Sequence, residues 1–551
     1  MALEQMTGGR LARTGFGWQA AALAVAVLVL MPVLALAIFA AKGSPGLWTH
    51  LIRNVLPAAA SQTVVLLAGV GVIVASIGTV TAWLVAACDF PGRRIFGWAL
   101  LLPLAVPTYI VAYAYLDLLH PVGPVQTLIR DILGYSSPRD LQLPDIRSMP
   151  GCILLLGLVL YPYVYLPVRA LFVMQAGNLV DAARMLGAGP VATFWRVVLP
   201  LARPAVAVGT ALALMESLND IGAAEFLGVR TMTVSVYSTW INRSDLPGAA
   251  QISLVMLAIV TGLILLERRG RKRQRYAAGA QRSQPIKRLR LRGWRAALAT
   301  LACALPVAFG FAAPAAYLAC KAWQRYVFAG LSPQIVDEAA NTALFAAVAT
   351  VIAVTLGLVV TGAARLRPGR LTQVTAQLST LGYAVPGTIL AIGLLPVVTL
   401  ADRQIDALAR AIWGHGPGLL LLGSGAALIY AYTARFLAIA TGGIESGLSR
   451  VPPSLDHVAR TLGRTPAGVF REVHMPIARP ALAAAGLLIF VDCVKELPAT
   501  LLLRPLNFET LSTHLYGEAA RGTYEDAAIA ALIIVAIGIL PVIVLARTIR
   551  R

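Results

Sequence analysis

Two pairs of acidic residues lie inside stretches of the sequence that are otherwise strongly apolar. Glu216 and Asp220 form one pair, and Asp492 and Glu496 form the other, with Lys495 beside it. Each pair is spaced about one helical turn apart, so its two carboxylates share one face of a helix. Ionisable groups are costly in hydrocarbon and mark a transport path or a helix–helix pair. The acids therefore predict a polar path through a membrane or, as the alternative, structural pairing with Lys495.

Other familiar site chemistries are excluded by residue spacing. None of the lysines follows a glycine, so the sequence has no Gly-Lys-Ser/Thr loop to hold a nucleotide phosphate and Mg²⁺. The cysteines contain no CxxC pair, the histidines show no metal-ligand spacing, and no HExxH motif is present. We therefore expect no catalytic residue, no metal site and no cofactor within this chain.

The composition indicates which elements must position the acids. Of 551 residues, 58% are hydrophobic and only 13% are charged, whereas soluble domains carry about 25% charged residues. A helix needs about 20 apolar residues to cross the hydrocarbon of a bilayer. Twelve stretches qualify or nearly do, centred on Leu28, Gly71, Tyr109, Leu160, Leu212, Ala258, Ala308, Ala353, Leu390, Ala431, Leu487 and Val535. The sequence predicts an all-α integral membrane protein with twelve transmembrane helices.

The net charge of +21 indicates the orientation of these helices. The stretch from Glu267 to Arg295 holds twelve basic residues and one acid, so the positive-inside rule places this linker in the cytoplasm. Alternation then places both termini in the cytoplasm, with thirty-two of the 46 basic residues on that side. The positive charge is thus concentrated in the loops on one side of the membrane. We therefore expect contact with the lipid bilayer but no nucleic-acid partner.

The linker, residues 267–293, separates two similar halves, residues 1–266 and 294–551. The segment DAARMLGAGPVATFWRVVLPLARPA, which begins at Asp181, recurs as HVARTLGRTPAGVFREVHMPIARPA from His457, with twelve identical positions. Six spans is an even number, so both halves have the same orientation. A pseudo-twofold axis along the membrane normal is expected to enclose a central path.

The best-matched segments are cytoplasmic loops, approximately residues 178–200 and 454–476. Such loops tolerate sequence drift unless something binds to them, so the match predicts a docking element. We expect a short helix ending at Leu186, a turn or close approach at Gly187, and a new helix beginning at Pro200. The alternative is a tight connector that merely recurs in an internal repeat.

These loops resemble the hallmark loop E-A-A-x3-G-x9-I-x-L-P of the permeases of bacterial binding-protein-dependent ABC importers. The first copy matches at Asp181, Ala182, Ala183, Gly187, Val197, Leu199 and Pro200, and the second at Ala459, Gly463, Val473 and Pro476. In the second copy, His457, Val458 and Met475 replace the Glu, Ala and Leu of the motif. The resemblance implies that two ABC ATPase subunits dock on the loops, with ATP and Mg²⁺ bound on those subunits.

The same resemblance covers essentially the whole chain and implies a fold and a function. The fold would be two homologous six-helix type I permease units in the bacterial inner membrane, served by an external solute-binding protein. The sequence around Glu216 and the segment from Asp492 to Pro505 are similar to the ferric-iron branch of this family. Permeases of that branch contain both six-helix units in one polypeptide. In that family the fifth span of each unit lines the path, so Glu216, Asp220, Asp492, Lys495 and Glu496 are the expected path residues.

Several alternatives remain at this level. Thiamine, phosphonate, sulfate or polyamine cargo is compatible with the same family. A proton-coupled secondary transporter could also have twelve spans in parallel repeats, with Glu216 or Asp220 carrying protons. A membrane-embedded enzyme would need a catalytic set that the sequence lacks.

Overall fold

The computed structural model describes residues 2–43, 48–135, 137–175, 182–183, 185–277, 288–366, 369–449 and 451–550. These residues are almost entirely helical. One two-residue pair of parallel strands, β1 (Cys88–Asp89) and β2 (Leu289–Arg290), is the exception in the described part. Helices satisfy every backbone hydrogen bond within one segment, which is the requirement that a hydrocarbon environment imposes.

Ten helices of the described chain are long and apolar enough to span a bilayer, and two bent helix pairs raise the number to twelve when each pair counts as one span. One pair, Arg93–Ala105 with Thr108–Leu118, bends by 90°, and the other, Met149–Leu160 with Pro162–Val173, bends by 40°. Pro107 and Pro162 lie at these bends, where a residue without a backbone N–H interrupts the helical ladder. All twelve predicted stretches coincide with these segments, so the predicted fold class is confirmed.

The chain divides into two compact bodies, which we call body 1 and body 2. Body 1 comprises Met1–Pro45, Thr239–Leu254 and Pro333–Thr513. Its elements are α1 (Ala2–Lys42), the first part of α14 (Leu246–Ala277), α17 (Pro333–Leu366), α18 (Arg370–Ser379), η5 (Leu381–Ala384), α19 (Gly387–Trp413), α20 (Leu420–Gly423), α21 (Ala426–Leu448), α22 (Pro453–Thr461), α23 (Pro466–Val469), η6 (Phe470–His474), α24 (Met475–Lys495) and α25 (Pro498–Leu503).

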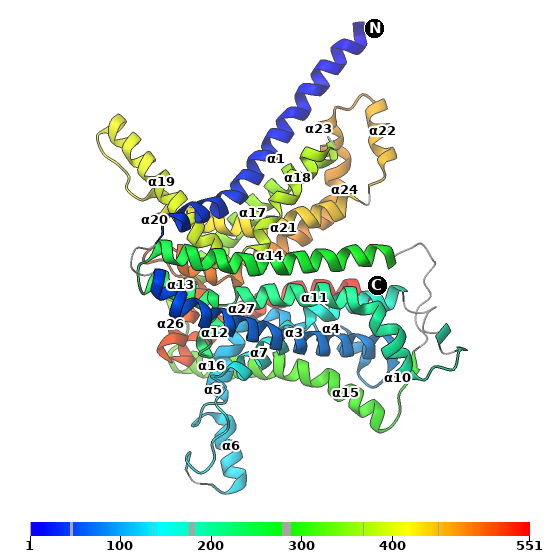
Figure 1. The fold of residues 1–551 in the computed structure, drawn as a ribbon, viewed down its shortest axis with the longest axis vertical. Coiled ribbons are helices and arrows are strands. Elements are labelled where there is room, and N and C mark those ends of the chain that lie inside the picture. The colour runs from blue at the N-terminus through cyan, green and yellow to red at the C-terminus, as the bar shows by residue number, and fades with distance from the viewer. Residues whose placement is uncertain are drawn as a thin grey trace. The chain divides into compact units, whose positions relative to one another are not determined.

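In body 1, α17, α21 and α24 pack on one another, and α1 runs along α17, α18 and α19 (Figure 1). The contact between α1 and α19 is close because Gly393 has no side chain. A Cβ atom there would lie 2.2 Å from the carbonyl oxygen of Pro32.

Body 2 comprises Gly46–Ser238, Val255–Ser332 and His514–Arg551. Its first elements are α2 (Trp48–His50), η1 (Leu51–Val55), α3 (Leu56–Ala87), α4 (Arg93–Ala99), η2 (Leu102–Ala105), α5 (Thr108–Leu118), α6 (Pro124–Leu133), α7 (Met149–Leu160), α8 (Pro162–Gln175), α10 (Pro190–Thr193), η3 (Phe194–Val198), α11 (Leu199–Asn219), α12 (Gly222–Phe226) and α13 (Met232–Ile241). The later elements are α15 (Trp294–Val307), η4 (Ala308–Ala312), α16 (Ala313–Ala329), α27 (Tyr524–Arg550) and most of α26 (Leu511–Arg521).

Body 2 repeats the helix arrangement of body 1. Its core is α3 packed on α7, α8 and α11, which corresponds to α17 packed on α21 and α24. The helices α16 and α27 pack along each other in the same body. A Cβ atom at Gly209 of α11 would lie 2.6 Å from the carbonyl oxygen of Tyr163, so this glycine permits the close contact with α8.

The compact bodies do not coincide with the two halves of the sequence. The first span of the first half, α1, belongs to body 1 with helices of the second half. Conversely, α15 and α16, the first span of the second half, belong to body 2. The repeat boundaries 1–266 and 294–551 stay a prediction about homology, and the central ten residues of the linker, 278–287, lie outside the described residues.

Candidate functional site

Both predicted docking loops contain the same glycine-terminated turn. Gly187 and Gly463 have φ of +82° and +80°, the left-handed region that L side chains rarely adopt. In the first loop the N–H of Ala188 donates to the carbonyl of Ala183 at 3.0 Å. The equivalent bond, from the N–H of residue 464 to the carbonyl of residue 459, is 3.1 Å long in the second loop. This is the hydrogen bond of a Schellman helix end, so the turn predicted at Gly187 is confirmed and occurs twice.

The residues just before each turn present apolar side chains to solvent. Met185 and Leu186 are almost fully exposed in the first loop. In the second loop, Leu462 and Val458 are exposed on or just after α22. Apolar side chains exposed at corresponding positions of a repeat indicate a surface that a partner covers.

The structure places the remaining motif residues as follows. Ala182 is exposed, Ala183 is half-buried and Ala459 is buried, and Asp181 lies outside the described residues. His457 lies in α22, but its side chain is outside the described part.

Each loop continues directly into a long span through one turn of π-helix. Thus η3 leads into α11 with Leu199 and Pro200 in its first turn, and η6 leads into α24 with Pro476 in its first turn. Pro200 and Pro476 have no backbone N–H and so interrupt the i→i−4 ladder at the point where the π-turn passes into the α-helix. The loops are therefore coupled to the fifth and eleventh spans without a flexible joint.

Equivalent aromatic residues at these joints fix each π-turn to a neighbouring span. The ring of Phe194 lies 5.7 Å from that of Trp83 on α3, and the ring of Phe470 lies 5.8 Å from that of Trp18 on α1. Displacement of either loop would therefore be transmitted to two spans of its own body.

At its other end, the fifth span is broken at Asp220. This residue leaves the helix with an extended backbone (φ −73°, ψ 120°) and is 8% exposed. Its Oδ1 accepts from the N–H of Ala223 at 2.7 Å, which caps the short helix α12. Its Oδ2 accepts from the hydroxyl of Thr108 on α5.

The eleventh span is broken in the same way at Glu496 (φ −69°, ψ 123°). The Glu496 carboxylate accepts from the N–H groups of Ala499 and Thr500, both at 3.0 Å, and so caps α25. Arg435 of α21 donates from Nη1 to the same carboxylate at 2.8 Å. Both charged side chains are buried.

A glycine explains why the two breaks use different partners. The Val-Pro pair before Thr108 recurs before Gly387, so Gly387 occupies the corresponding position of the second half. A Cβ atom at Gly387 would lie 2.5 Å from Oε1 of Glu496 and 2.6 Å from Nη1 of Arg435. The absence of a side chain thus makes room for the ion pair.

These contacts sort the five predicted path residues into two groups. Asp220 and Glu496 are buried and hold the breaks in their spans, whereas Glu216, Asp492 and Lys495 are only half-buried. The ion pair found for Glu496 is formed by Arg435, and the pairing of Lys495 with Asp492 stays a prediction.

The segments that follow the breaks are anchored by a second repeated device, missed at the sequence level. The hydroxyl of Thr342 on α17 accepts from the N–H of Leu511, and the hydroxyl of Thr63 on α3 accepts from the N–H of Met232, both at 2.9 Å. A comparison of Gln62-Thr63 with Asn341-Thr342 at the same repeat spacing could have revealed it.

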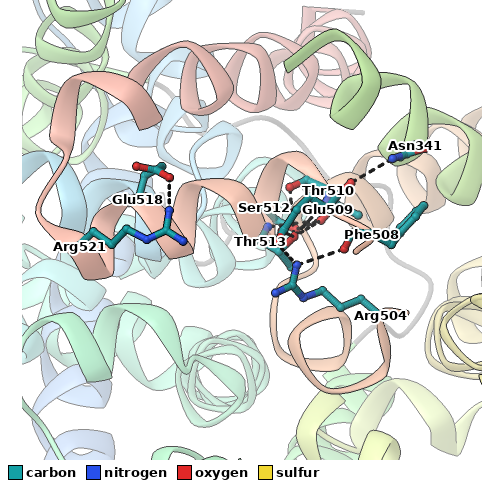
Figure 2. Close-up of polar contacts among 9 residues, drawn as sticks. All are labelled: Asn341, Arg504, Phe508, Glu509, Thr510, Ser512, Thr513, Glu518 and Arg521. Carbon is teal, nitrogen blue, oxygen red and sulfur yellow. Dashed lines mark hydrogen bonds and ion pairs between the residues drawn. The ribbon is translucent and has the colours of Figure 1, made fainter. Parts of the chain in front are cut away.

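In body 1, Glu509 is the centre of this anchor (Figure 2). Its carboxylate pairs with Arg504 and accepts from the hydroxyl of Thr513 at 2.7 Å, and its carbonyl accepts from Asn341 at 3.3 Å. The chain between Arg504 and Glu509 carries Leu506, which is 95% exposed.

Arg435 was also missed, and its sequence placement needs correction. The thirty-two basic residues counted as cytoplasmic include those of the segment from Arg435 to Arg479, but Arg435 lies within α21 and is buried against Glu496. A local count of basic residues cannot detect a partner 61 positions away.

Comparison with known proteins is consistent with this repeated architecture. The family described as "Binding-protein-dependent transport system inner membrane component" matches residues 78–276 and again residues 353–551. The chain is 24% identical over 498 residues, 88% of both chains, to the Fe(3+)-transport system permease protein FbpB 2 of Haemophilus influenzae.

Two other similar proteins match shorter stretches of the chain. The putative 2-aminoethylphosphonate transport system permease protein PhnU of Salmonella typhimurium is 28% identical over 195 residues, 35% of this chain and 67% of that protein. The molybdenum transport system permease protein ModB of Escherichia coli is 28% identical over 195 residues, 34% of this chain and 82% of that protein.

Proposed function

Because the chain belongs to the family of binding-protein-dependent transport system inner membrane components, we propose that it is the fused, two-unit permease of an ATP-driven importer of ferric iron. The choice of cargo rests on how much of this chain each similar permease matches. The similarity to the Fe(3+) permease extends over 88% of both chains, whereas the phosphonate and molybdenum permeases match about one third of this chain.

We propose that two ATPase subunits dock on the repeated loops and that ATP and Mg²⁺ bind only on those subunits. The contact residues would be Asp181, Ala182, Ala183, Gly187, Leu199 and Pro200 in the first loop, and His457, Ala459, Gly463 and Pro476 in the second. Support comes from the identical turns at Gly187 and Gly463 and from the exposed apolar side chains beside them.

The connection from loop to span suggests how ATP hydrolysis drives transport. Movement of a docked ATPase would displace the loop, and the π-turns at Phe194 and Phe470 would pass this displacement to α11 and α24. The 21 residues of α11 extend for about 32 Å, nearly the full thickness of the membrane. The displacement would thus reach the breaks at Asp220 and Glu496, where each span changes direction.

Glu216, Asp492 and Lys495 are the proposed path residues beside these breaks. A hard trivalent cation prefers oxygen ligands, so half-buried carboxylates suit ferric iron as substrate. Asp220 and Glu496 are already engaged by backbone N–H groups, and their proposed role is to hold the path open beside Glu216 and Asp492.

Transport by reconstituted protein tests the proposal. The full chain is placed in proteoliposomes with its ATPase and its solute-binding protein, and uptake of ferric iron, 2-aminoethylphosphonate and molybdate is compared. We expect iron uptake that needs ATP and the binding protein. Uptake of phosphonate or molybdate without iron would overturn the cargo, and uptake by the chain alone in a proton gradient would overturn the importer class in favour of a secondary transporter.

A further inference from the structure

A charged cavity of about 490 Å³ lies in body 2, and none of its lining residues belongs to a docking loop or to a break. Its volume is within the range of small-molecule sites, roughly 300–1,000 Å³. It is lined by Asp117 at the end of α5, by Lys321 and Arg325 of α16, and by Tyr524, Glu525 and Asp526 at the start of α27.

Three ion pairs organise the cavity. Lys321 lies 3.1 Å from Glu525 and 3.7 Å from Asp117, and the Nε of Arg325 lies 2.5 Å from Asp526. Asp526 and Glu525 are about half-exposed at the mouth, whereas Lys321 and Asp117 lie deeper. The site therefore offers both signs of charge, with accessible carboxylates and a part-buried guanidinium.

Two further tyrosines contact the lining residues Asp117 and Tyr524. The hydroxyl of Tyr317 donates to Asp117, and the ring of Tyr113 lies 5.3 Å from the ring of the cavity residue Tyr524. Tyr113 is fully buried, lies within electrostatic range of Asp117, and its hydroxyl has no hydrogen-bond partner among the residues that the structure describes. A buried hydroxyl without a partner is costly, so a polar group that reached it would be stabilised.

The length of the span containing α16 places the cavity at the headgroup level of the bilayer. About 20 residues cross ~30 Å of hydrocarbon, so a span that starts just after Arg295 leaves the hydrocarbon near Tyr317. Lys321 and Arg325 follow one and two turns later, which is where the polar headgroups lie.

Exposed side chains on the same span agree with this placement. Trp323, Tyr326 and Phe328 are exposed on the last turns of α16, as in the aromatic belt of a membrane interface. Leu305 and Phe309 are exposed lower on the same span, so acyl chains have an apolar surface below the cavity.

We propose that this cavity binds the zwitterionic phosphoethanolamine headgroup of a phospholipid. The phosphate would contact Arg325 and Lys321, and the ammonium would contact Asp526 and Glu525. The lining holds two cations and three carboxylates, so a zwitterion can offer an opposite charge to both kinds of group, whereas a purely anionic or purely cationic ligand can do so for only one of them. In the described residues no group of His, Cys, Asp and Glu side chains is arranged to hold a metal ion, so a bare cation is the poorer match.

Native mass spectrometry of the full-length chain tests the proposal. The protein is mixed with phosphatidylethanolamine, phosphatidylcholine and phosphatidylglycerol of identical acyl chains. Phosphatidylcholine has the same charges but no N–H donor, and phosphatidylglycerol lacks the ammonium. We expect phosphatidylethanolamine to be retained about tenfold more than either lipid, the equivalent of one charge-assisted hydrogen bond. Equal retention of the three lipids would overturn the proposal.

Variants assign the effect to the cavity. Arg325→Gln should reduce phosphatidylethanolamine retention about tenfold, and Asp526→Asn should reduce it while increasing the relative retention of phosphatidylglycerol, because a repulsive carboxylate is removed. The matched control is Arg410→Gln, which removes a guanidinium that is paired with Asp406 in body 1 and should change nothing. Unchanged lipid preference in both cavity variants would refute the site, and Asp526→Asn at the exposed mouth serves if Arg325→Gln fails to fold.

A competition arm distinguishes the lipid from a soluble zwitterion of the same chemistry. Millimolar free phosphoethanolamine should not displace the lipid, because the acyl chains contribute to binding. Displacement at that concentration would show that a soluble phosphoamine, and not the bilayer, supplies the ligand. Retention does not depend on transported cargo, so this result is independent of the iron assay.

Discussion

Arg435 and Glu496 form a buried ion pair of 2.8 Å between the middle of α21 and the break that ends α24. The Glu496 carboxylate also caps α25 through two backbone N–H groups. In the other body, Asp220 caps α12 but has a neutral hydroxyl, that of Thr108, as its partner. Both halves of the repeat therefore have a carboxylate at the break, but its side-chain partner is an arginine in one half and a threonine hydroxyl in the other.

The first prediction concerns this asymmetry. Glu496→Gln leaves the Arg435 guanidinium buried without a counter-charge, and we expect a loss of about 3–5 kcal/mol in stability. Asp220→Asn keeps the hydrogen-bonded shape without stranding a charge, and should cost only about 1–2 kcal/mol. Thermal unfolding of the detergent-purified chain measures both.

A double variant supplies the control for that prediction. Arg435→Met combined with Glu496→Gln removes the stranded charge and should be more stable than Glu496→Gln alone. If Glu496→Gln and Asp220→Asn melt at the same temperature, the ion pair is not the stabilising element that the geometry indicates.

A second prediction follows from the missing side chain at Gly387. Gly387→Ala places a methyl group against the ion pair, and we expect destabilisation by about 1–3 kcal/mol, typical of overpacking. The control is Gly442→Ala in α21, where a Cβ atom would meet nothing within 4 Å; this change should be neutral or slightly stabilising. Equal melting temperatures for the two variants would contradict the steric explanation.

The docking turns give a third prediction. Gly187→Ala together with Gly463→Ala forces a side chain into left-handed backbone, at a cost of about 1–2 kcal/mol for each turn. ATPase co-purification should fall at least tenfold while the melting temperature of the permease changes little, because the exposed turns can relieve the strain by local rearrangement without unfolding the spans. Asparagine at the two positions should restore part of the binding, since it tolerates this backbone conformation.

Gly189→Ala is the matched control in the same loop, because Gly189 is also surrounded by open space but lacks a positive φ. It should leave ATPase binding intact. If the double variant at Gly187 and Gly463 behaves like Gly189→Ala, the loops are ordinary connectors.

The proposed path residues give a fourth prediction. Glu216→Gln combined with Asp492→Asn removes two half-buried carboxylates without touching either cap, so ATP-dependent iron uptake should fall at least tenfold at unchanged expression and ATPase binding. The control is Asp131→Asn in α6. Asp131 is exposed and does not belong to α11 or α24, the spans that carry Glu216 and Asp492. Normal uptake by the double variant would contradict the path hypothesis and favour a structural role for these acids.

The parts predicted correctly from sequence depend on local physics. The spans around Leu28 to Val535 follow from runs of apolar residues long enough to cross a bilayer, and the turn at Gly187 follows from the backbone freedom of one residue. The expectation that Glu216 and Asp220 share one helix face is wrong, because α11 ends at Asn219 and Asp220 leaves the helix with an extended backbone.

The sequence by itself therefore determined the membrane class, the positions of the apolar spans, the internal repeat and the glycine turns of the two repeated loops. Only the tertiary structure decided that α1 packs in body 1, that Arg435 neutralises Glu496 and that Gly387 makes room for this pair. An apolar helix surface does not specify which neighbour it meets, and an ion pair between residues 61 positions apart leaves no local pattern. Such contacts are set by the packing of whole helices, which single-residue spacing does not encode.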